Sequence, residues 1–297
     1  MRPRHDVAGL RILITGAASG IGRALSLQLG AAGALLYLTD LQQQRLDEVA
    51  AEITAAGGGV VLAQAADVAD IDAVTALAGR AHESADALDA VLNVAGIATW
   101  GTVSTLTHEQ WRRVIEVNLM GPIHVIECFV PPMVAARRGG YLVNVSSAAG
   151  LIGMPWHAAY SASKFGVRGV SEVLRFDLAR HKISVSLVCP GGVDTPLTET
   201  VQVAGIDQNS TVFRAMQKRF RKRAVSPERA ASAIVDGMLA RRYLVYTSRD
   251  IQLIHFVQRY VPPLYALLMR LANRGADALA ARAGITASVA DTTMGTR

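Results

Sequence analysis

A tyrosine and a lysine lie four positions apart in the run Tyr160-Ser-Ala-Ser-Lys164. If the run is helical, both side chains lie on one face, and the ammonium group lies beside the phenol. A nearby cation stabilises a phenolate and lowers the phenol pKa from about 10. Such a tyrosine is an acid/base for interconverting an alcohol and a carbonyl near neutral pH. Upstream, Ser147 offers a hydroxyl for the substrate oxygen, with a local turn hydrogen bond as the alternative.

A glycine-rich turn, Thr15-Gly16-Ala17-Ala18-Ser19-Gly20-Ile21-Gly22, follows the first apolar run. Glycines let the backbone approach a pyrophosphate, and the next helix offers free N–H groups and a positive dipole end. A tight strand-to-helix turn without a ligand also uses glycine. Asp40 follows the second apolar run and is placed to accept hydrogen bonds from ribose hydroxyls, unless it only caps the next helix. Its carboxylate would repel a 2′-phosphate, so the pattern favours NAD(H).

Apolar runs of strand length alternate with helix-length periodic segments. Continuous apolar strands are typical of a parallel sheet covered on both faces. The pattern predicts an α/β domain over residues 7–248, a doubly wound Rossmann fold with a mostly seven-stranded parallel sheet, and a helical C-terminal tail over 249–297. The predicted strands are Leu10–Thr15, Ala34–Thr39, Val60–Ala65, Ala87–Val94, Tyr141–Ser146, Ile183–Val188 and Tyr243–Tyr246. The predicted helices are Gly20–Ala32, Leu41–Ala55, Ile71–His82, His108–Leu119, Pro122–Arg137, Ala158–His181 and Pro227–Arg241.

The order of these motifs resembles the short-chain dehydrogenase/reductase family over residues 10–196, and more loosely to 247. The matching features are Thr15–Gly22, Asp67, Asn93-Val94-Ala95-Gly96, Asn118, Ser147, Tyr160-x3-Lys164 and Pro190-Gly191-Gly192-Val193-Asp194-Thr195. Val94 stands where the family often has asparagine or alanine. The resemblance implies hydride transfer between NAD(H) and an alcohol or ketone.

The resemblance also implies a role for each matching residue. Tyr160 would be the general acid/base, and Lys164 would bind the nicotinamide ribose and depress the Tyr160 pKa. Ser147 would orient the substrate oxygen, and Asn118 would hold a helix kink and a water of the proton relay. Asp67 would contact adenine, Asn93 would support the central sheet, and Val193 and Thr195 would bind the carboxamide. The full predicted NAD set is Gly16, Ser19, Gly20, Ile21, Gly22, Asp40, Asp67, Val68, Asn93, Ala95, Gly96, Tyr160, Lys164, Pro190, Gly191, Val193 and Thr195.

In this family the substrate loops follow Gly96, Ser147 and Pro190, and here they are apolar. They contain Ile97, Trp100, Leu151, Ile152, Met154, Pro155, Trp156, Leu197, Val201 and Val203. We expect a hydrophobic alcohol or ketone as substrate, although some of these side chains could instead pack against the tail. His157 is expected to be a loop histidine, with a place in the site as the alternative. The seven histidines show no metal-ligand spacing, so no metal is expected.

Composition excludes several other classes of protein. With 51% hydrophobic residues and only two cysteines in 297 residues, the chain is neither disordered nor disulfide-stapled. Few cysteines fit a reducing compartment, so a cytoplasmic protein is expected. Neither an export signal nor a membrane-spanning helix is expected. The net charge of +6 equals the six basic residues between 214 and 223, in an expected lid over 196–225: Arg214, Lys218, Arg219, Arg221, Lys222 and Arg223.

The basic segment and the tail leave alternatives open. The basic segment is a solvated helix face, or it attracts an anionic substrate or an anionic bilayer. The apolar stretch 251–271, split by Pro262-Pro263, either lies in a membrane interface or docks on a partner subunit or over the cleft. The family implies a homodimer or homotetramer built on the helices near His108–Arg137 and Ala158–His181. A non-catalytic NAD-binding scaffold is the competing function, and too few aromatics interleave with the basic residues for nucleic-acid binding.

Overall fold

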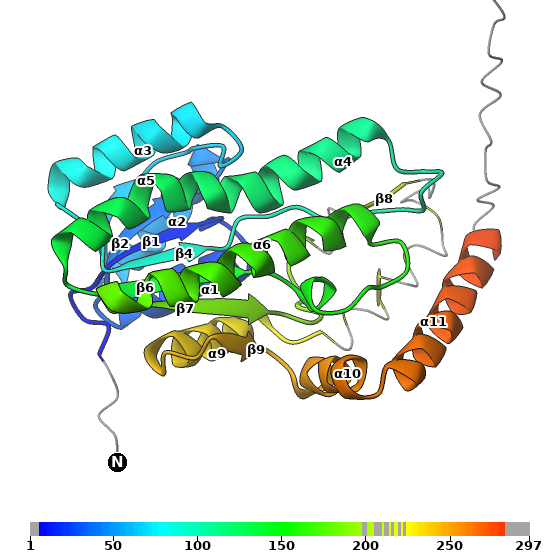
Figure 1. Cartoon of the computed structure of the whole chain (residues 1–297). Helices are drawn as coiled ribbons and strands as arrows, with labels where there is room; N and C mark the ends of the chain where they lie inside the picture. Colours follow the sequence, from blue (N-terminus) through cyan, green and yellow to red (C-terminus); the bar gives the residue numbers. More distant parts are fainter. Residues whose placement is uncertain are drawn as a thin grey trace, which may run out of the picture.

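The computed structural model describes residues 6–197, 201–204, 210, 214, 217–218, 221 and 224–282. Within these residues, seven parallel strands form one sheet in the order β3-β2-β1-β4-β6-β7-β9 (Figure 1). The predicted doubly wound fold is therefore confirmed. The strands are β1 (Arg11–Thr15), β2 (Leu35–Thr39), β3 (Gly59–Ala63), β4 (Ala90–Asn93), β6 (Gly140–Val145), β7 (Ile183–Cys189) and β9 (Leu244–Tyr246).

Helices cover both faces of this sheet, as Figure 1 shows. Alternate residues of β1 enter opposite cores: Ile12 and Ile14 pack in one, and Leu13 in the other. The first core is covered by α1 (Gly20–Ala31), α2 (Gln43–Ala55) and α9 (Pro227–Leu239). The second is covered by α3 (Ile71–Ser84), α4 (His108–Ile115), α5 (Gly121–Ala136) and α6 (Ala158–Asp177). Burial on both faces explains why the strands are continuously apolar.

The order of the strands places the ligand-binding crevice. From β1 the chain moves outward to β2 and β3, then returns to the other side of β1 with β4. Ligands of open α/β sheets bind at such a reversal, outside the carboxyl ends of the strands. Thr15 ends β1 and Asn93 ends β4, so the predicted cofactor residues start at this position.

Two features of the fold differ from the sequence prediction. The predicted helices His108–Leu119 and Pro122–Arg137 are one continuous helix, because a π-helical turn at Glu116–Met120 joins α4 to α5. Among the described residues, the joined stretch His108–Ala136 is the one helix that is long and apolar enough to cross a membrane, by length and composition only. Phe129, Val130 and Met133 on its α5 part are buried in the second core, as expected for a helix of the domain.

A second, two-stranded sheet was also missed, formed by β5 (Thr99–Trp100) and β8 (Gln202–Val203). These strands are too short to give a periodic signal in the sequence.

The predicted tail forms two helices, α10 (Arg249–Tyr260) and α11 (Pro262–Arg282), which meet at the two prolines. The inner face of α10 packs beside β7 and β9, and the Tyr246 hydroxyl lies 2.8 Å from His255 Nδ1. In Figure 1, α11 continues along the edge of the molecule toward which the strands point. The tail therefore borders the ligand-binding edge of the sheet.

Candidate active site

The glycine-rich turn has a backbone that only glycine allows. Gly16 has a φ of 67°, and an added Cβ would lie 2.9 Å from the Cα of Ala95. At Gly22 an added Cβ would lie only 2.0 Å from the carbonyl oxygen of Gly16. Thr15 Oγ1 accepts hydrogen bonds from the N–H groups of Val94 and Ala95, at 2.9 and 3.0 Å. The turn after β1 and the loop after β4 are thus held in contact.

The start of α1 is suited to an anion. Gly20 opens the helix, and the first turn holds no acidic residue. Ser19 is the N-cap residue, but its hydroxyl makes no capping hydrogen bond, which leaves the first N–H groups of the helix for another acceptor. Ile21 packs against the core below this turn.

Asp40 lies beside the glycine-rich turn and is not the cap of α2. Its Oδ2 accepts a hydrogen bond from the Ala18 N–H at 3.0 Å, while the N-cap residue of α2 is Gln42. The Asp40 backbone carbonyl accepts from the N–H of Ala66, one residue before Asp67. The next residue, Val68, packs beneath Gly121, and its carbonyl oxygen lies 2.9 Å from His124 Nδ1. The structure thus gathers the residues predicted to hold the adenosine half.

Tyr160, Ser147 and Lys164 come together at the first turns of α6. The Ser147 hydroxyl lies near enough to the Tyr160 phenol to lower its pKa, and Lys164 Nζ lies 5.7 Å from the centroid of the Tyr160 ring. Lys164 is only 4% exposed, and its Nζ donates to the carbonyl oxygen of Val145 at 3.0 Å. Ser147 Oγ also accepts from the Ala149 N–H, so the local turn bond is present as well. The neighbouring Ser146 instead donates to the Lys164 carbonyl oxygen, as its position on the strand predicted.

Burial dominates the pKa shifts of this group. Burial raises the pKa of Tyr160, and the nearby Ser147 hydroxyl only partly opposes that rise. Burial also lowers the Lys164 pKa to about 8. The net shift of the Tyr160 pKa is therefore upward, because burial takes the phenolate out of water. A lowering of the Tyr160 pKa by Lys164 stays a prediction.

Asn118 lies on the π-helical turn and is completely buried. Its Oδ1 accepts from the Ile97 N–H at 2.8 Å, and its Nδ2 donates to the Ile97 carbonyl at 2.9 Å. Nδ2 also reaches Ser163 Oγ at 3.3 Å, a partner that the sequence analysis missed. A methyl group built on Gly96 would lie 3.0 Å from Asn118 Oδ1 and 3.5 Å from Lys164 Nζ. Gly96 therefore lets Asn118 and Lys164 approach the same space.

A chain of buried polar groups supports the centre of the sheet. Asn93 Nδ2 donates to Asn144 Oδ1, and Asn144 Nδ2 donates to Ser171 Oγ, both at 2.9 Å. Asn93 Oδ1 is buried and has no hydrogen-bond partner among the described residues. Asn144 and Ser171 were not predicted, because no local pattern marks a contact between a strand and a helix 27 residues later.

The loop after β7 closes the cofactor side of the crevice. The Pro190 carbonyl oxygen accepts from the Ala148 N–H at 2.7 Å, which ties this loop to the one that carries Ser147. A Cβ added to Gly20 would lie 3.0 Å from Thr195 Cγ2, so Thr195 covers the glycine-rich turn. Val193 forms a bridge with Val225, while a Cβ on Gly191 would meet Ile251 of α10 at 2.8 Å.

The three substrate loops meet over Tyr160. β5 pairs with β8, and the Gly101 N–H donates to the Trp156 carbonyl at 2.8 Å. Trp156 has a left-handed φ of 65°, which a non-glycine residue adopts only where its surroundings fix it. The predicted lining residues that pack with Tyr160 are Trp100, Trp156, Leu197, Val201 and Val203.

Other predicted lining residues have a different place. Leu151 and Ile152 are buried in the cluster that includes Met154, Ile254 of α10 and Tyr265 of α11. For Leu151 and Ile152 the alternative expectation, packing against the tail, is therefore confirmed. The ring of His157 lies 4.5 Å from that of Trp100 and 6.3 Å from that of Tyr160. His157 therefore borders the site, and burial lowers its pKa.

Much of the predicted lid lies outside the described residues, including Arg219, Lys222 and Arg223 of the basic segment. Of the described members, Arg221 pairs with Asp194 at 2.8 Å, beside Val193 and Thr195 of the cofactor loop. Within the part of the chain that the structure describes, no group of His, Cys, Asp or Glu side chains is arranged to hold a metal ion.

Comparisons with known proteins agree with this geometry. The family model described as short chain dehydrogenase matches residues 11–204. A Mycobacterium tuberculosis protein described as an oxidoreductase, SadH, is 34% identical over 86% of this chain and 92% of its own. The trans-4-hydroxycyclohexanecarboxylate dehydrogenase of Sinomonas cyclohexanicum is 40% identical over 66% of this chain and 77% of its own. A short chain dehydrogenase/reductase from Burkholderia phymatum, solved in complex with NAD, superposes with a TM-score of 0.77 at 27% identity, over 87% and 96% of the two chains.

Proposed function

Because the chain belongs to the short-chain dehydrogenase/reductase family of oxidoreductases, we propose that it transfers hydride between NAD(H) and a hydrophobic alcohol or ketone. The observation that carries the proposal is the contact of Tyr160 with Ser147, beside the buried Lys164 and under the apolar substrate loops.

The residues around the crevice fit a dinucleotide. A Cβ at Gly16 would clash with the backbone of Ala95, and one at Gly22 would clash with the carbonyl oxygen of Gly16, so glycine at both positions lets the turn after β1 close tightly beneath the start of α1, as a pyrophosphate-binding turn requires. The uncapped start of α1 supplies N–H donors to it. When bound, NAD(H) supplies or accepts the hydride and, once oxidised, brings positive charge to the site.

Tyr160 then moves the proton. In the oxidising direction its phenolate accepts the proton of the substrate hydroxyl while hydride leaves the carbinol carbon; in the reducing direction it returns the proton to the carbonyl oxygen. Ser147 donates to that oxygen and stabilises its developing charge. Lys164 and Asn118, which share the space beside Gly96, bind the ribose and hold a water that exchanges the proton with solvent.

Asp40 gives the preference for NAD(H). Its Oδ2 is engaged by Ala18, and its other oxygen lies only 3.3 Å from the Gln42 N–H, so the carboxylate is fixed beside the turn. A fixed carboxylate accepts from ribose hydroxyls and repels a 2′-phosphate.

The remaining parts of the proposal concern the substrate class, the oligomeric state and the location of the protein. The two tryptophans and the valines beside Tyr160 support a hydrophobic substrate. The exposed Phe165, Val173 and Phe176 of α6, together with the apolar helix His108–Ala136, support a homodimer or homotetramer. Two free cysteines support a cytoplasmic location. Peripheral contact with a membrane through 214–223 and 251–271 belongs to the same proposal.

The test is turnover with NAD⁺ and NADP⁺ separately, against a panel of hydrophobic secondary alcohols, followed by the near-ultraviolet absorbance of the reduced cofactor. We expect turnover with NAD⁺ that falls by about a thousandfold in Tyr160→Phe, while NADH binding, read by fluorescence, is unchanged. Faster turnover with NADP⁺ would contradict the assignment of Asp40. Full activity in Tyr160→Phe would contradict the mechanism. Tight NADH binding with no turnover on any panel member would favour a non-catalytic NAD-binding scaffold.

A further inference from the structure

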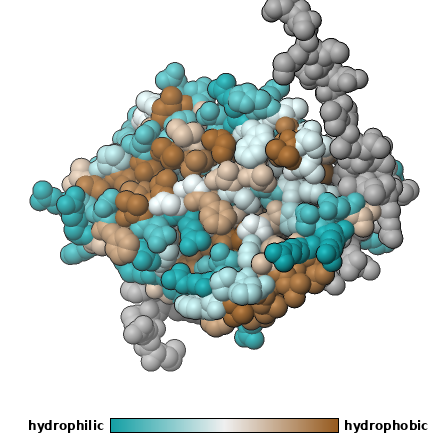
Figure 2. All heavy atoms as spheres, turned by 45° about the vertical axis from the view of Figure 1, so that its right-hand side comes forward, coloured by the Kyte–Doolittle hydropathy of each residue, from teal (hydrophilic) through white to brown (hydrophobic). Residues whose placement is uncertain are grey.

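The C-terminal helices carry a large exposed apolar surface. Eight large apolar side chains of these helices and of the residue between them are between 38% and 65% exposed: Leu253, Phe256, Tyr260, Val261, Leu264, Leu267, Leu268 and Leu271. A helix that only packs on its own domain would bury such residues. An exposed apolar patch of this kind marks a contact with another surface. In Figure 2 hydrophobic residues gather along the lower edge of the molecule, at the height at which Figure 1 draws α10 and the start of α11.

The exposed side chains follow the helical repeat. On α11, Leu264, Leu267, Leu268 and Leu271 have the spacing i, i+3, i+4 and i+7, so they form one stripe. An adjoining face of α11 meets the domain, because the Tyr265 hydroxyl donates to the carbonyl oxygen of Gly153 at 2.9 Å. Because α11 packs on the domain through other residues, the leucine stripe faces outward.

The preceding helix, α10, has the same arrangement. On α10 the exposed Leu253, Phe256 and Tyr260 share one face, while Ile251 and Ile254 pack inward against the domain. The two outward faces adjoin at Val261, where the helices meet.

Positive charge borders this apolar surface. Arg249, Arg259, Arg270 and Arg274 lie on the two helices, against the acids Asp250 and Asp277. Arg270 and Arg274 also line an open depression of about 550 Å³ between α11 and the segment Gly153–Pro155. Guanidinium groups beside leucines match the boundary between phosphate headgroups and acyl chains.

We propose that α10 and α11 form a docking surface that lies in the headgroup region of an anionic bilayer. The pair does not span, since α10 has only 12 residues, Pro262 follows it, and arginines interrupt α11. A second copy of the chain fits this surface less well, because an isologous contact would bring two surfaces of net positive charge together. An anionic bilayer instead neutralises this charge.

Docking would also determine where the substrate enters. Tyr265 fixes α11 to the loop after Ser147, and Ile251 fixes α10 to Gly191. The bilayer surface and the substrate loops are thus held together, so a lipid-dissolved alcohol or ketone would reach Tyr160 without crossing water. Entry of the substrate from the bilayer rests on the proposed hydride transfer, whereas docking deepens only the membrane-contact part of the proposed function and does not depend on turnover.

The test is flotation of the full chain with phosphatidylcholine vesicles, with and without about a third phosphatidylglycerol. We expect flotation with the anionic vesicles at low salt, and loss of more than tenfold in binding in Leu267→Gln/Leu271→Gln. Arg270→Gln/Arg274→Gln should bind about fivefold more weakly for each charge removed. The matched control, Val61→Gln/Val103→Gln, removes two exposed apolar side chains elsewhere and should float as the unchanged protein does.

Other outcomes overturn the proposal. NADH binding by each variant shows that it is folded, and because flotation needs no turnover, a wrong enzymatic assignment leaves this test intact. If the unchanged protein stays with the aqueous fraction, or if the leucine variant floats equally well, docking through this surface is wrong. If the unchanged protein does not float and its mass by light scattering falls in the leucine variant, the surface joins copies of the chain instead.

Discussion

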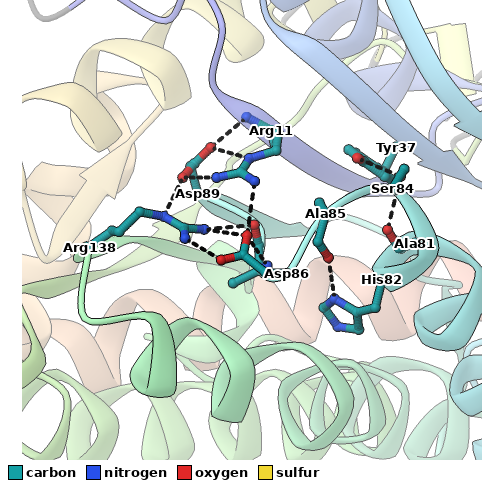
Figure 3. A network of polar contacts seen from close by, with 10 residues as sticks. Arg11, Tyr37, Ala81, His82, Ser84, Ala85, Asp86, Asp89 and Arg138 are labelled. Atoms are coloured by element: carbon teal, nitrogen blue, oxygen red, sulfur yellow. Dashed lines mark hydrogen bonds and ion pairs between the residues drawn. The ribbon is translucent and has the colours of Figure 1, made fainter.

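Charged side chains are exposed and paired at one end of the sheet and buried without an opposite charge at the other. At the amino ends of β1, β4 and β6, Arg11 pairs with Asp89 at 3.0 Å, and Arg138 pairs with Asp86 at 2.6 Å (Figure 3). These groups are partly or largely exposed, and Arg138 holds the Asp86 pKa down at about 2. At the carboxyl ends, Lys164 is buried with a backbone carbonyl as its hydrogen-bond acceptor, and burial raises the pKa of Tyr160.

The difference indicates that the charged groups at the amino end serve the fold, whereas those at the carboxyl end serve the reaction. Exposed ion pairs with several partners neutralise themselves and add little to stability. A buried lysine without a carboxylate costs stability, and a protein keeps such a group where the charge acts on a ligand. The carboxyl end should therefore respond to substitution in activity, and the amino end only slightly in stability.

Apart from Tyr160→Phe, the largest expected effect contrasts two adjacent serines at the carboxyl end. Ser147→Ala removes the hydroxyl that contacts Tyr160 and should lower kcat about 100-fold, with little change in stability. Ser146→Ala removes only the hydrogen bond to the Lys164 carbonyl and should cost about 1 kcal/mol of stability. Steady-state kinetics and urea unfolding on both variants check this. Equal losses of kcat would show that position 147 acts through packing alone.

This pair also shows what the sequence could predict. Tyr160, Lys164 and the glycine-rich turn are visible because their spacing follows helix and turn geometry, and the strand alternation separated Ser146 from Ser147. The β5–β8 pair, the Asn93–Asn144–Ser171 chain and the contact of Asn118 with Ser163 join residues distant in sequence, so no periodicity marks them. The direction of the Tyr160 pKa depends on burial, which only the folded chain determines.

The second prediction contrasts two buried asparagines. Asn118→Ala leaves the N–H and carbonyl groups of Ile97 without their partners and should cost about 2 kcal/mol of stability, together with about tenfold in kcat. Asn144→Ala breaks its bonds to Asn93 and Ser171, at a distance from the proton relay. It should lose similar stability but keep kcat within about threefold. Unfolding and turnover assays on the same samples give the comparison, and an equal loss of kcat in both variants would refute a special role for Asn118.

The third prediction uses the pH dependence of the free energy of unfolding to test whether the Lys164 ammonium group is buried. The pKa of Lys164 is lowered from its ordinary value of 10.5 to about 8 in the folded protein. Between these two values the unfolded chain binds more protons than the folded one, so the free energy of unfolding rises with pH. The free energy of unfolding of the unchanged protein, minus that of Lys164→Met, should rise by about 2 kcal/mol from pH 8 to 9.5. Burial raises the Cys189 pKa to about 12, so Cys189 acts in the opposite direction, and taking the difference removes its contribution apart from its own electrostatic interaction with Lys164. A flat difference would mean that Lys164 titrates as an exposed lysine.

The smallest effect is expected at the amino end. Because the folded pKa of Asp86 is lowered to about 2 from 3.8, its ion pairing stabilises the fold above pH 3.8, and this contribution is lost as the pH falls toward 2. Asp86→Asn should lower Tm by at most about 2 °C at neutral pH, by less in high salt, and leave kcat unchanged. Calorimetry at both salt concentrations, with turnover on the same samples, measures this. A loss of kcat in Asp86→Asn would show that the ion pairs of one end hold the catalytic groups of the other, and the division between the two ends would then fail.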